Sequence, residues 1–198
     1  MTNVPANPRH SSAKENWGTP PWIVEAARRV MGSIDLDPAS SEEANKVVRA
    51  GCYFTKEDDG LSGLWNLHDE RKLNVWLNPP GGKTVDGKSK VKLWWQKKLT
   101  QREGPGCEYS LLDFPTCFFK RRVDFIDPVT GKPVKGNTHS SCITYVPGSL
   151  NETDYFYEVF SEFGKIVGHG DGSAKSEPQR YGEWAGVGIM TNDIGPLP

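Results

Sequence analysis

Asn74-Val75-Trp76-Leu77, followed at once by Asn78-Pro79-Pro80, is the stretch of sequence that decides the fold. The first four residues predict a short buried strand. The two prolines end it, because neither can donate a hydrogen bond to a sheet ladder. In open α/β sheets, ligands bind beyond the carboxyl ends of the strands, and the tripeptide is expected at such an end. Its prolines pin the backbone, so an Asn amide and a proline carbonyl are held in fixed positions.

Two acceptors fixed in this way suit the methylation of an exocyclic amine. The lone pair of an amino group on an aromatic base is delocalised into the ring. The side-chain oxygen of Asn78 and the carbonyl of Pro79 can accept the two amino hydrogens, which directs the lone pair toward a methyl donor. Positioning supplies most of the remaining rate enhancement. The alternative interpretation is a rigid turn, which two prolines alone would explain.

Helices and strands alternate on both sides of this stretch. Thr19 is expected to cap a helix that has Pro20 as its first residue and ends at Gly32. Strands are predicted over 33–37 and 52–55, with a helix between them that begins at Ser40 or Ser41 and ends near Gly51, and a further helix over 90–99. Such alternation predicts a parallel α/β sheet.

The second half of the chain is expected to be richer in strands, over 123–126, 143–146 and 165–167, with a helix over 155–163. The stretch 100–109 is short, and the apolar strand expected after the helix at 90–99 is not found in 100–106, so the sheet is either truncated or lacks a segment. The predicted organisation is a flexible arm at 1–16, one domain at 17–167 and a Gly/Ser-rich segment at 168–198.

Composition narrows the class of protein. The chain has 198 residues and a net charge of -1, which suits one domain. No run of 18 apolar residues predicts a membrane span, and the polar N-terminus has no secretory signal. Four scattered cysteines suit a reducing cytoplasm. His68, His139 and His169 are far apart in sequence, so no metal site is expected.

Charge is distributed in blocks. Nine acids and three bases lie between Asp35 and Glu70, whereas seven bases and one acid lie between Lys83 and Arg102. Basic blocks attract phosphates, although a solvated surface is the plainer explanation. The basic residues nearest the tripeptide are Lys83, Lys88, Lys90, Lys92, Lys97 and Lys98, with Arg121 and Arg122 forming a second patch.

Several blocks, taken in order, resemble the phage-type DNA N-6-adenine methyltransferase (Dam-like) family. They are Trp17-Gly18-Thr19-Pro20, Asp35-Leu36-Asp37-Pro38-Ala39-Ser40-Ser41, Tyr53-Phe54-Thr55, Asp59-Gly60-Leu61 with Trp65, the strand with its tripeptide, Phe114-Pro115-Thr116, the block at 120–125 and the block at 137–141. The resemblance implies a Rossmann-like, S-adenosylmethionine-dependent core that acts on a flipped adenine in double-stranded DNA. It also implies the cytoplasm of a bacterial host for a phage-encoded protein.

The resemblance implies roles for individual residues. Thr19 and Pro20 would lie beside the cofactor. Asp37, Pro38 and Ala39 would replace a Gly-rich loop under its methionine part, while Asp59 would reach its adenine and Leu61 would lie in the same cofactor-binding block. Asn78, Pro79 and Pro80 match the catalytic motif, and Asn78 also borders the cofactor. Without the resemblance, Asp37 and Asp59 are more simply a helix cap and a turn residue.

One departure from the family pattern matters most. An aromatic residue usually follows the tripeptide and stacks on the flipped base, but here the residue is Gly81. Trp94, Trp95 and Phe114 are the candidates for a replacement ring, and each could equally be a core residue. Neighbouring residues on a helix point about 100° apart, so we expect Trp94 in the core and Trp95 exposed as the stacking ring. Gly81 and the short sheet favour an alternative, a catalytically silent relative that binds DNA or protein. A third possibility, methylation of glutamine side chains in proteins, is disfavoured by the basic loops.

Overall fold

The computed structural model describes residues 17–65, 73–103, 113–135, 140–147, 153–168 and 185–191, of which 101–103 and 185–191 are described as backbone. The expectations for the arm at 1–16 and for His68, His139 and His169 lie outside these residues.

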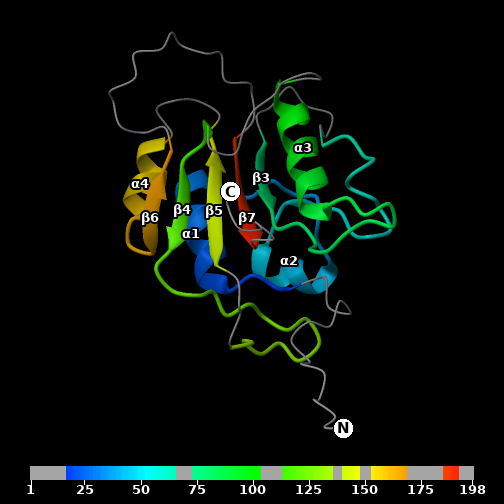
Figure 1. Cartoon of the computed structure of the whole chain (residues 1–198), viewed down its shortest axis with the longest axis horizontal. Helices are drawn as coiled ribbons and strands as arrows, with labels where there is room; N and C mark the ends of the chain where they lie inside the picture. Colours follow the sequence, from blue (N-terminus) through cyan, green and yellow to red (C-terminus); the bar gives the residue numbers. More distant parts are fainter. Residues whose placement is uncertain are drawn as a thin grey trace, which may run out of the picture.

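A seven-stranded sheet with the order β2-β1-β3-β7-β5-β4-β6 forms the centre of the molecule (Figure 1). The strands β2, β1, β3 and β7 are parallel, whereas β5, β4 and β6 each run antiparallel to their neighbours. The fold is therefore mixed α/β, half parallel and half antiparallel. The strands are β1 (Leu36–Asp37), β2 (Cys52–Tyr53), β3 (Asn74–Leu77), β4 (Thr116–Phe119), β5 (Ser141–Val146), β6 (Gly164–Val167) and β7 (Ala185–Thr191).

Helices cover both faces of the sheet. Trp76 of β3 lies in one core cluster with Ile23 and Phe156, while Val75 and Leu77 point the opposite way and lie in a cluster with a residue of α3. This alternation is the two-residue period of a strand buried on both faces. Within the described residues, no helix is both long and apolar enough to cross a bilayer. The helices are α1 (Pro21–Met31), α2 (Glu42–Val48), α3 (Lys90–Glu103) and α4 (Thr153–Phe160).

The strand β7 joins the parallel half of the sheet to the antiparallel half. It is paired with β3 from Asn74↔Ala185 to Leu77↔Gly188, and its other edge is paired with β5. A strand was expected directly after the helix at 90–99. The position beside β3 is instead occupied by β7, which comes much later in the sequence. The predicted domain limit at residue 167 falls before this strand, whose two glycines weaken the sequence signal for a strand.

Three local predictions differ from the structure. Residues 123–126 form no strand, but Ile126 makes isolated bridges, and the neighbouring strand β4 was not predicted. The helix α1 has Pro20 as its N-cap with no side-chain cap, so Thr19 does not cap it. The predicted end at Gly32 is confirmed, as is the cap of α2, where Ser41 accepts a hydrogen bond from the Ala44 amide at 3.1 Å.

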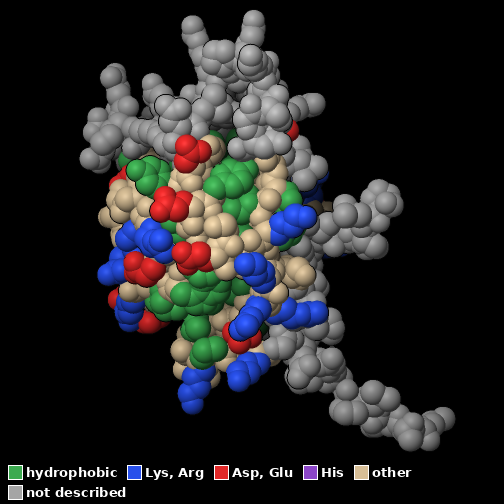
Figure 2. Space-filling model, turned by 90° about the vertical axis from the view of Figure 1, so that its left-hand side faces the viewer, with side chains coloured by type: hydrophobic (Ala, Val, Ile, Leu, Met, Phe, Trp, Pro, Cys, Tyr) green, Lys and Arg blue, Asp and Glu red, His purple; other side chains and the backbone are tan. Residues whose placement is uncertain are grey.

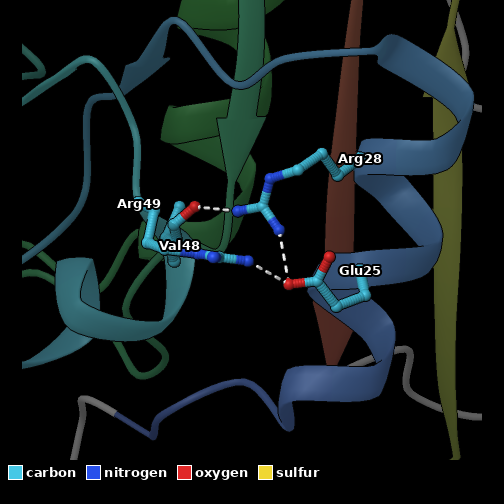
Figure 3. A network of polar contacts seen from close by, with 4 residues as sticks. All are labelled: Glu25, Arg28, Val48 and Arg49. Atoms are coloured by element: carbon cyan, nitrogen blue, oxygen red, sulfur yellow. Dashed lines mark hydrogen bonds and ion pairs between the residues drawn. The ribbon is translucent and has the colours of Figure 1, made fainter.

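A small polar network ties α1 to the end of α2 (Figure 3). Arg28 donates to Glu25 at 2.7 Å and also to the carbonyl of Val48, and Arg49 forms an ion pair with the same carboxylate. These ion pairs lower the pKa of Glu25. Because Glu25 and Arg49 are exposed, each ion pair contributes little stability by itself, and the network joins α1 to the last residues of α2.

Candidate active site

The parallel strands β1 and β3 end side by side at one edge of the sheet, called here the carboxyl edge. Leu36 is in register with Val75, so Asp37 is level with Trp76 and lies close to the position where Asn78 follows β3. The topology thus brings together two residues that are separated by 41 positions in the sequence. This is the place where open α/β sheets bind their ligands.

The side-chain amide of Asn78 is held by the segment that precedes α1. Its Nδ2 atom donates to the carbonyl oxygen of Trp17 at 3.1 Å and to Oγ1 of Thr19 at 3.0 Å. Thr19 is buried, with 6% of its surface exposed, and Pro79 is buried beside the half-buried Asn78. The structure therefore joins the Thr19-Pro20 block to the tripeptide.

A two-stranded bridge clamps this preceding segment in place. The amide of Gly18 donates to the carbonyl of Ile126 at 2.9 Å, and the amide of Ile126 donates back at 2.8 Å. A Cβ atom on Gly18 would lie 3.2 Å from the Cβ of Ile126, so the close approach favours glycine. Ile126 belongs to residues 120–135, called here the basic segment.

Asp37 is a carboxylic acid buried at the end of β1. It is 2% exposed, and burial raises its pKa to about 7. The Ala39 amide donates to Oδ1 at 3.3 Å and favours the ionised form, but it does not offset the loss of solvation. A carboxyl group in this condition can be ionised by a cation placed beside it.

The acidic loop after β2 packs against the turn that follows Asp37. A Cβ on Gly60 would stand 2.1 Å from the carbonyl oxygen of Pro38, and the indole of Trp65 donates to the Gly60 carbonyl at 2.7 Å. Asp59 and Leu61 flank Gly60 in the sequence, so this contact also brings them near the turn at Pro38. Asp59 itself is exposed, has a φ of 46° and accepts a hydrogen bond from the Ser62 hydroxyl at 2.6 Å.

Residues 81–89 form a short hairpin directly after the tripeptide. Lys83 and Ser89 make an antiparallel bridge, and the amide of Thr84 donates to the carbonyl of Lys88 at 2.8 Å. Lys88 also pairs with Asp86 at 2.8 Å. The three lysines Lys83, Lys88 and Lys92 are exposed and Lys90 is half-buried. Because the hairpin directly follows the tripeptide and leads into α3, this group starts from the carboxyl edge.

The basic segment lies at the same edge. The strand β4 runs in the direction of β3, because β7 is parallel to β3 and the two following pairs are antiparallel. It therefore ends at the carboxyl edge and delivers the exposed Arg121 and Arg122 there. Figure 2 shows Lys and Arg side chains gathered over the lower half of the face that carries β6 and α4.

Two predictions about α3 are wrong. Trp95 is 3% exposed and packs with Leu99, Phe114 and Val146, so its ring is not on the surface. Lys98 is also buried, with Nζ 5.4 Å from the centre of the Trp95 ring. Trp94 is in the core as predicted.

Among the described residues, no three His, Cys, Asp or Glu side chains are grouped in a way that suits a metal ion. Burial raises the pKa of Cys117 to about 12 and that of Cys142 to about 11, which keeps both as thiols. Because the thiolate is the nucleophile, a raised pKa disfavours a nucleophilic role for either cysteine.

Sequence reasoning missed the contribution of Trp17 and Gly60. The carbonyl of Trp17 acts through the backbone, which no side-chain pattern reports. The close approach of Gly60 to Pro38 joins segments that no local signal connects, although a glycine inside an acidic turn was a visible hint.

A family model described as DNA N-6-adenine-methyltransferase (Dam) matches residues 7–106, half of the chain. A protein of Escherichia phage T1 named DNA N-6-adenine-methyltransferase is 26% identical, over 78% of this chain and 71% of its own length. No solved structure matches significantly. The family match covers the elements from α1 to α3, including the tripeptide.

Proposed function

The chain belongs to the DNA N-6-adenine-methyltransferase (Dam) family, and from that premise we propose that it transfers a methyl group to the amino group of a flipped adenine in DNA. The observation that carries the proposal is the position of Asn78-Pro79-Pro80 at the carboxyl edge, with the Asn78 amide held from behind by two acceptors. The parallel strands β2, β1, β3 and β7 would form the Rossmann-like core that such an enzyme needs.

The acceptor side of the reaction rests on two oxygens. Oδ1 of Asn78 and the carbonyl of Pro79 would accept the two hydrogens of the adenine amino group. This directs the nitrogen lone pair out of the ring and stabilises the positive charge that develops on nitrogen. The prolines keep both oxygens in place, so little reorganisation is needed during the reaction.

The residues at the edge fit S-adenosylmethionine, which when bound supplies a methyl group on a positively charged sulfur. Burial raises the pKa of the Asp37 carboxyl, and a cationic ligand beside it would favour its ionised form. Pro38 and Ala39 form the turn beside it, with Asp59 and Leu61 carried to that turn. Thr19 and Pro20 would close the site next to Asn78.

Binding of double-stranded DNA would use the two basic groups at the carboxyl edge. Lys83, Lys88, Lys90 and Lys92 lie on one side of the tripeptide, while Arg121 and Arg122 follow β4. Contacts of this kind neutralise phosphates and position the duplex without reading its sequence. The displaced bases need such support, because the target base has to leave the stack.

A catalytically silent relative that binds DNA or protein is the second candidate. Gly81 favours it, because the ring expected after the tripeptide is absent, and the burial of Trp95 removes the replacement expected for it. The sheet no longer favours this candidate, since β7 occupies the place beside β3. Methylation of protein glutamines is disfavoured by the basic groups at the edge.

Calorimetry followed by a methyl-transfer assay tests the proposal. S-adenosylmethionine is titrated into the protein, and label transfer to mixed-sequence DNA is then measured. Asn78→Ala should lower turnover by on the order of a hundredfold or more while cofactor affinity stays close to normal. Absence of cofactor binding at millimolar concentration would favour the silent relative, and near-normal turnover in the variant would reduce the tripeptide to a turn.

A further inference from the structure

We propose that Thr19 and the carbonyl of Trp17 form an orienting pair that fixes the side-chain amide of Asn78 with its oxygen toward the substrate. The inference rests on the proposed function and deepens it. Thr19 is a positioning residue in this account, because it acts through Asn78 and not on the adenine. The same pair dictates that residue 78 carries an amide.

The orientation follows from hydrogen-bonding capacity alone. A backbone carbonyl can only accept, so the group that faces the Trp17 oxygen at 3.1 Å has to be the NH2 of the amide. Its second hydrogen is directed to Oγ1 of Thr19 at 3.0 Å. Both amide hydrogens are then committed to protein. Within the described part of the chain, Oδ1 of Asn78 receives no protein hydrogen bond, so it is available to an incoming amino group.

The orienting pair cannot easily move away from the amide. Thr19 is buried, and Gly18 lies between the two acceptors and is fixed to Ile126 by a pair of backbone hydrogen bonds. Immediately afterwards Pro20 and Pro21 begin α1, which packs into the core through Ile23. The acceptors therefore belong to a preformed frame, and their geometry exists before any ligand binds.

The pair also explains why aspartate would be a poor substitute at position 78. Aspartate has the same shape as asparagine, but both of its oxygens only accept when it is ionised. One of them would face the Trp17 carbonyl at the present 3.1 Å, which places two acceptors in contact. The Thr19 hydroxyl can turn to donate, whereas the carbonyl cannot.

A double-mutant cycle tests the inference. Thr19→Val keeps the shape and removes the hydroxyl. It should lower kcat about tenfold, and this loss should exceed any rise in the Kd for S-adenosylmethionine, which Thr19 is expected to border. In an Asn78→Ala background the same change should lower kcat no further. With Asn78 present, Thr19→Ser keeps the hydroxyl and should therefore keep most of the wild-type rate. Thr144→Val is the matched control. Thr144 is a fully buried residue of β5, and its hydroxyl is hydrogen-bonded to that of Thr116, with 2.9 Å between the two oxygens. It should lower Tm and leave kcat unchanged.

Two results would overturn the inference. One is an equal loss of kcat from Thr19→Val in both backgrounds, and the other is a loss that resides in cofactor affinity alone. Nuclear magnetic resonance of the Asn78 side-chain NH2 gives a readout that does not require activity. Its hydrogens should exchange slowly, and Thr19→Val, but not Thr144→Val, should speed the exchange.

The NMR result separates this inference from the proposed function. A protein with no methyl transfer but with a protected NH2 that depends on Thr19 would remove the proposed function and keep the orienting pair. Unchanged exchange in Thr19→Val would remove the pair whatever the activity. Asn78→Asp should lose at least as much turnover as Thr19→Val, and retention of normal turnover would contradict the requirement for an amide.

Discussion

The carbonyl oxygen of Pro38 occupies the space in which a side chain on Gly60 would begin. A Cβ built on Gly60 lies 2.1 Å from that oxygen and 3.0 Å from a ring carbon of Trp94. Residue 60 therefore has to be glycine for the acidic loop to close over the turn after β1. The contact links the turn at Pro38, which is proposed to hold the methionine part of the cofactor, to the loop with Asp59, which is proposed to reach its adenine.

Gly60→Ala should weaken S-adenosylmethionine binding by on the order of tenfold or more. The added methyl forces the turn at Pro38 or the loop itself to move, and either shift misplaces the proposed cofactor contacts. Calorimetry gives the affinity. Gly63→Ala is the matched control, because its nearest neighbour would be 3.7 Å away, an ordinary contact. Equal affinity in the two variants would contradict the assignment of this loop to the cofactor.

Asp37 should make stability depend on pH. Its pKa is raised from 3.8 to about 7 by folding, so the folded state holds the proton more tightly than the unfolded state. The stabilising effect is complete below about pH 4 and is lost as pH rises through 7, with an upper limit of about 4 kcal/mol. Urea unfolding of wild type and Asp37→Asn at several pH values measures it. The variant should have a flatter profile between pH 4 and 7 and gain relative stability above pH 7, and parallel profiles would argue against a buried acid.

Removal of the lysines near the tripeptide should change the salt dependence of DNA binding. Lys88, Lys90 and Lys92 changed together to Ala should weaken binding about equally for all sequences. The slope of log K against log salt should fall by about 0.9 for each phosphate that the variant no longer neutralises. Arg29→Ala is the control, because Arg29 is exposed in the last turn of α1, at the end of the helix away from Asn78, and it should leave the slope unchanged. If the triple variant has the wild-type slope, these lysines belong to solvated surface.

Trp95→Ala should act on stability and not on DNA recognition. The ring is buried among Leu99, Phe114 and Val146, so its removal should cost about 3–5 kcal/mol of unfolding free energy. Trp95→Phe should cost much less, because among the described residues the buried indole N–H has no acceptor. Chemical denaturation measures both. Full stability of the alanine variant together with weakened DNA binding would contradict the burial of Trp95 and indicate a ring that contacts DNA.

The parts of the fold that sequence predicted are those with local causes. The strand over 74–77 has the predicted bounds, since an apolar run ends at two prolines. The cap at Ser41 and the end at Gly32 depend on neighbours a few residues away. The strand β7 depends on two distant partners, β3 more than a hundred residues earlier and β5 40 to 50 residues earlier. Its own residues include two glycines, so no local signal marks it.

The structure brings several of the predicted site residues together, but through contacts that the sequence did not predict. Thr19 was expected as a helix cap, yet its hydroxyl serves Asn78. Of Trp94 and Trp95, one ring was expected to be buried and the other exposed, because the helix was assumed to pack against a single core. The helix α3 instead packs over two clusters, one on the parallel side with Leu36 and one on the other side with Val146, so neighbouring rings are both buried.

The late position of β7 in the chain gives this protein a built-in order of assembly. During synthesis β3 and β5 emerge with their facing edges unpaired, and they meet their common partner only after residue 191 has left the ribosome. Closure over such sequence distances slows folding and exposes strand edges to other chains. The strand that leads to the tripeptide therefore lacks one of its neighbours until β7 docks between β3 and β5. A chain cut before residue 185 should aggregate. Adding the peptide 185–191 in trans tests whether the unpaired edges of β3 and β5 are the cause.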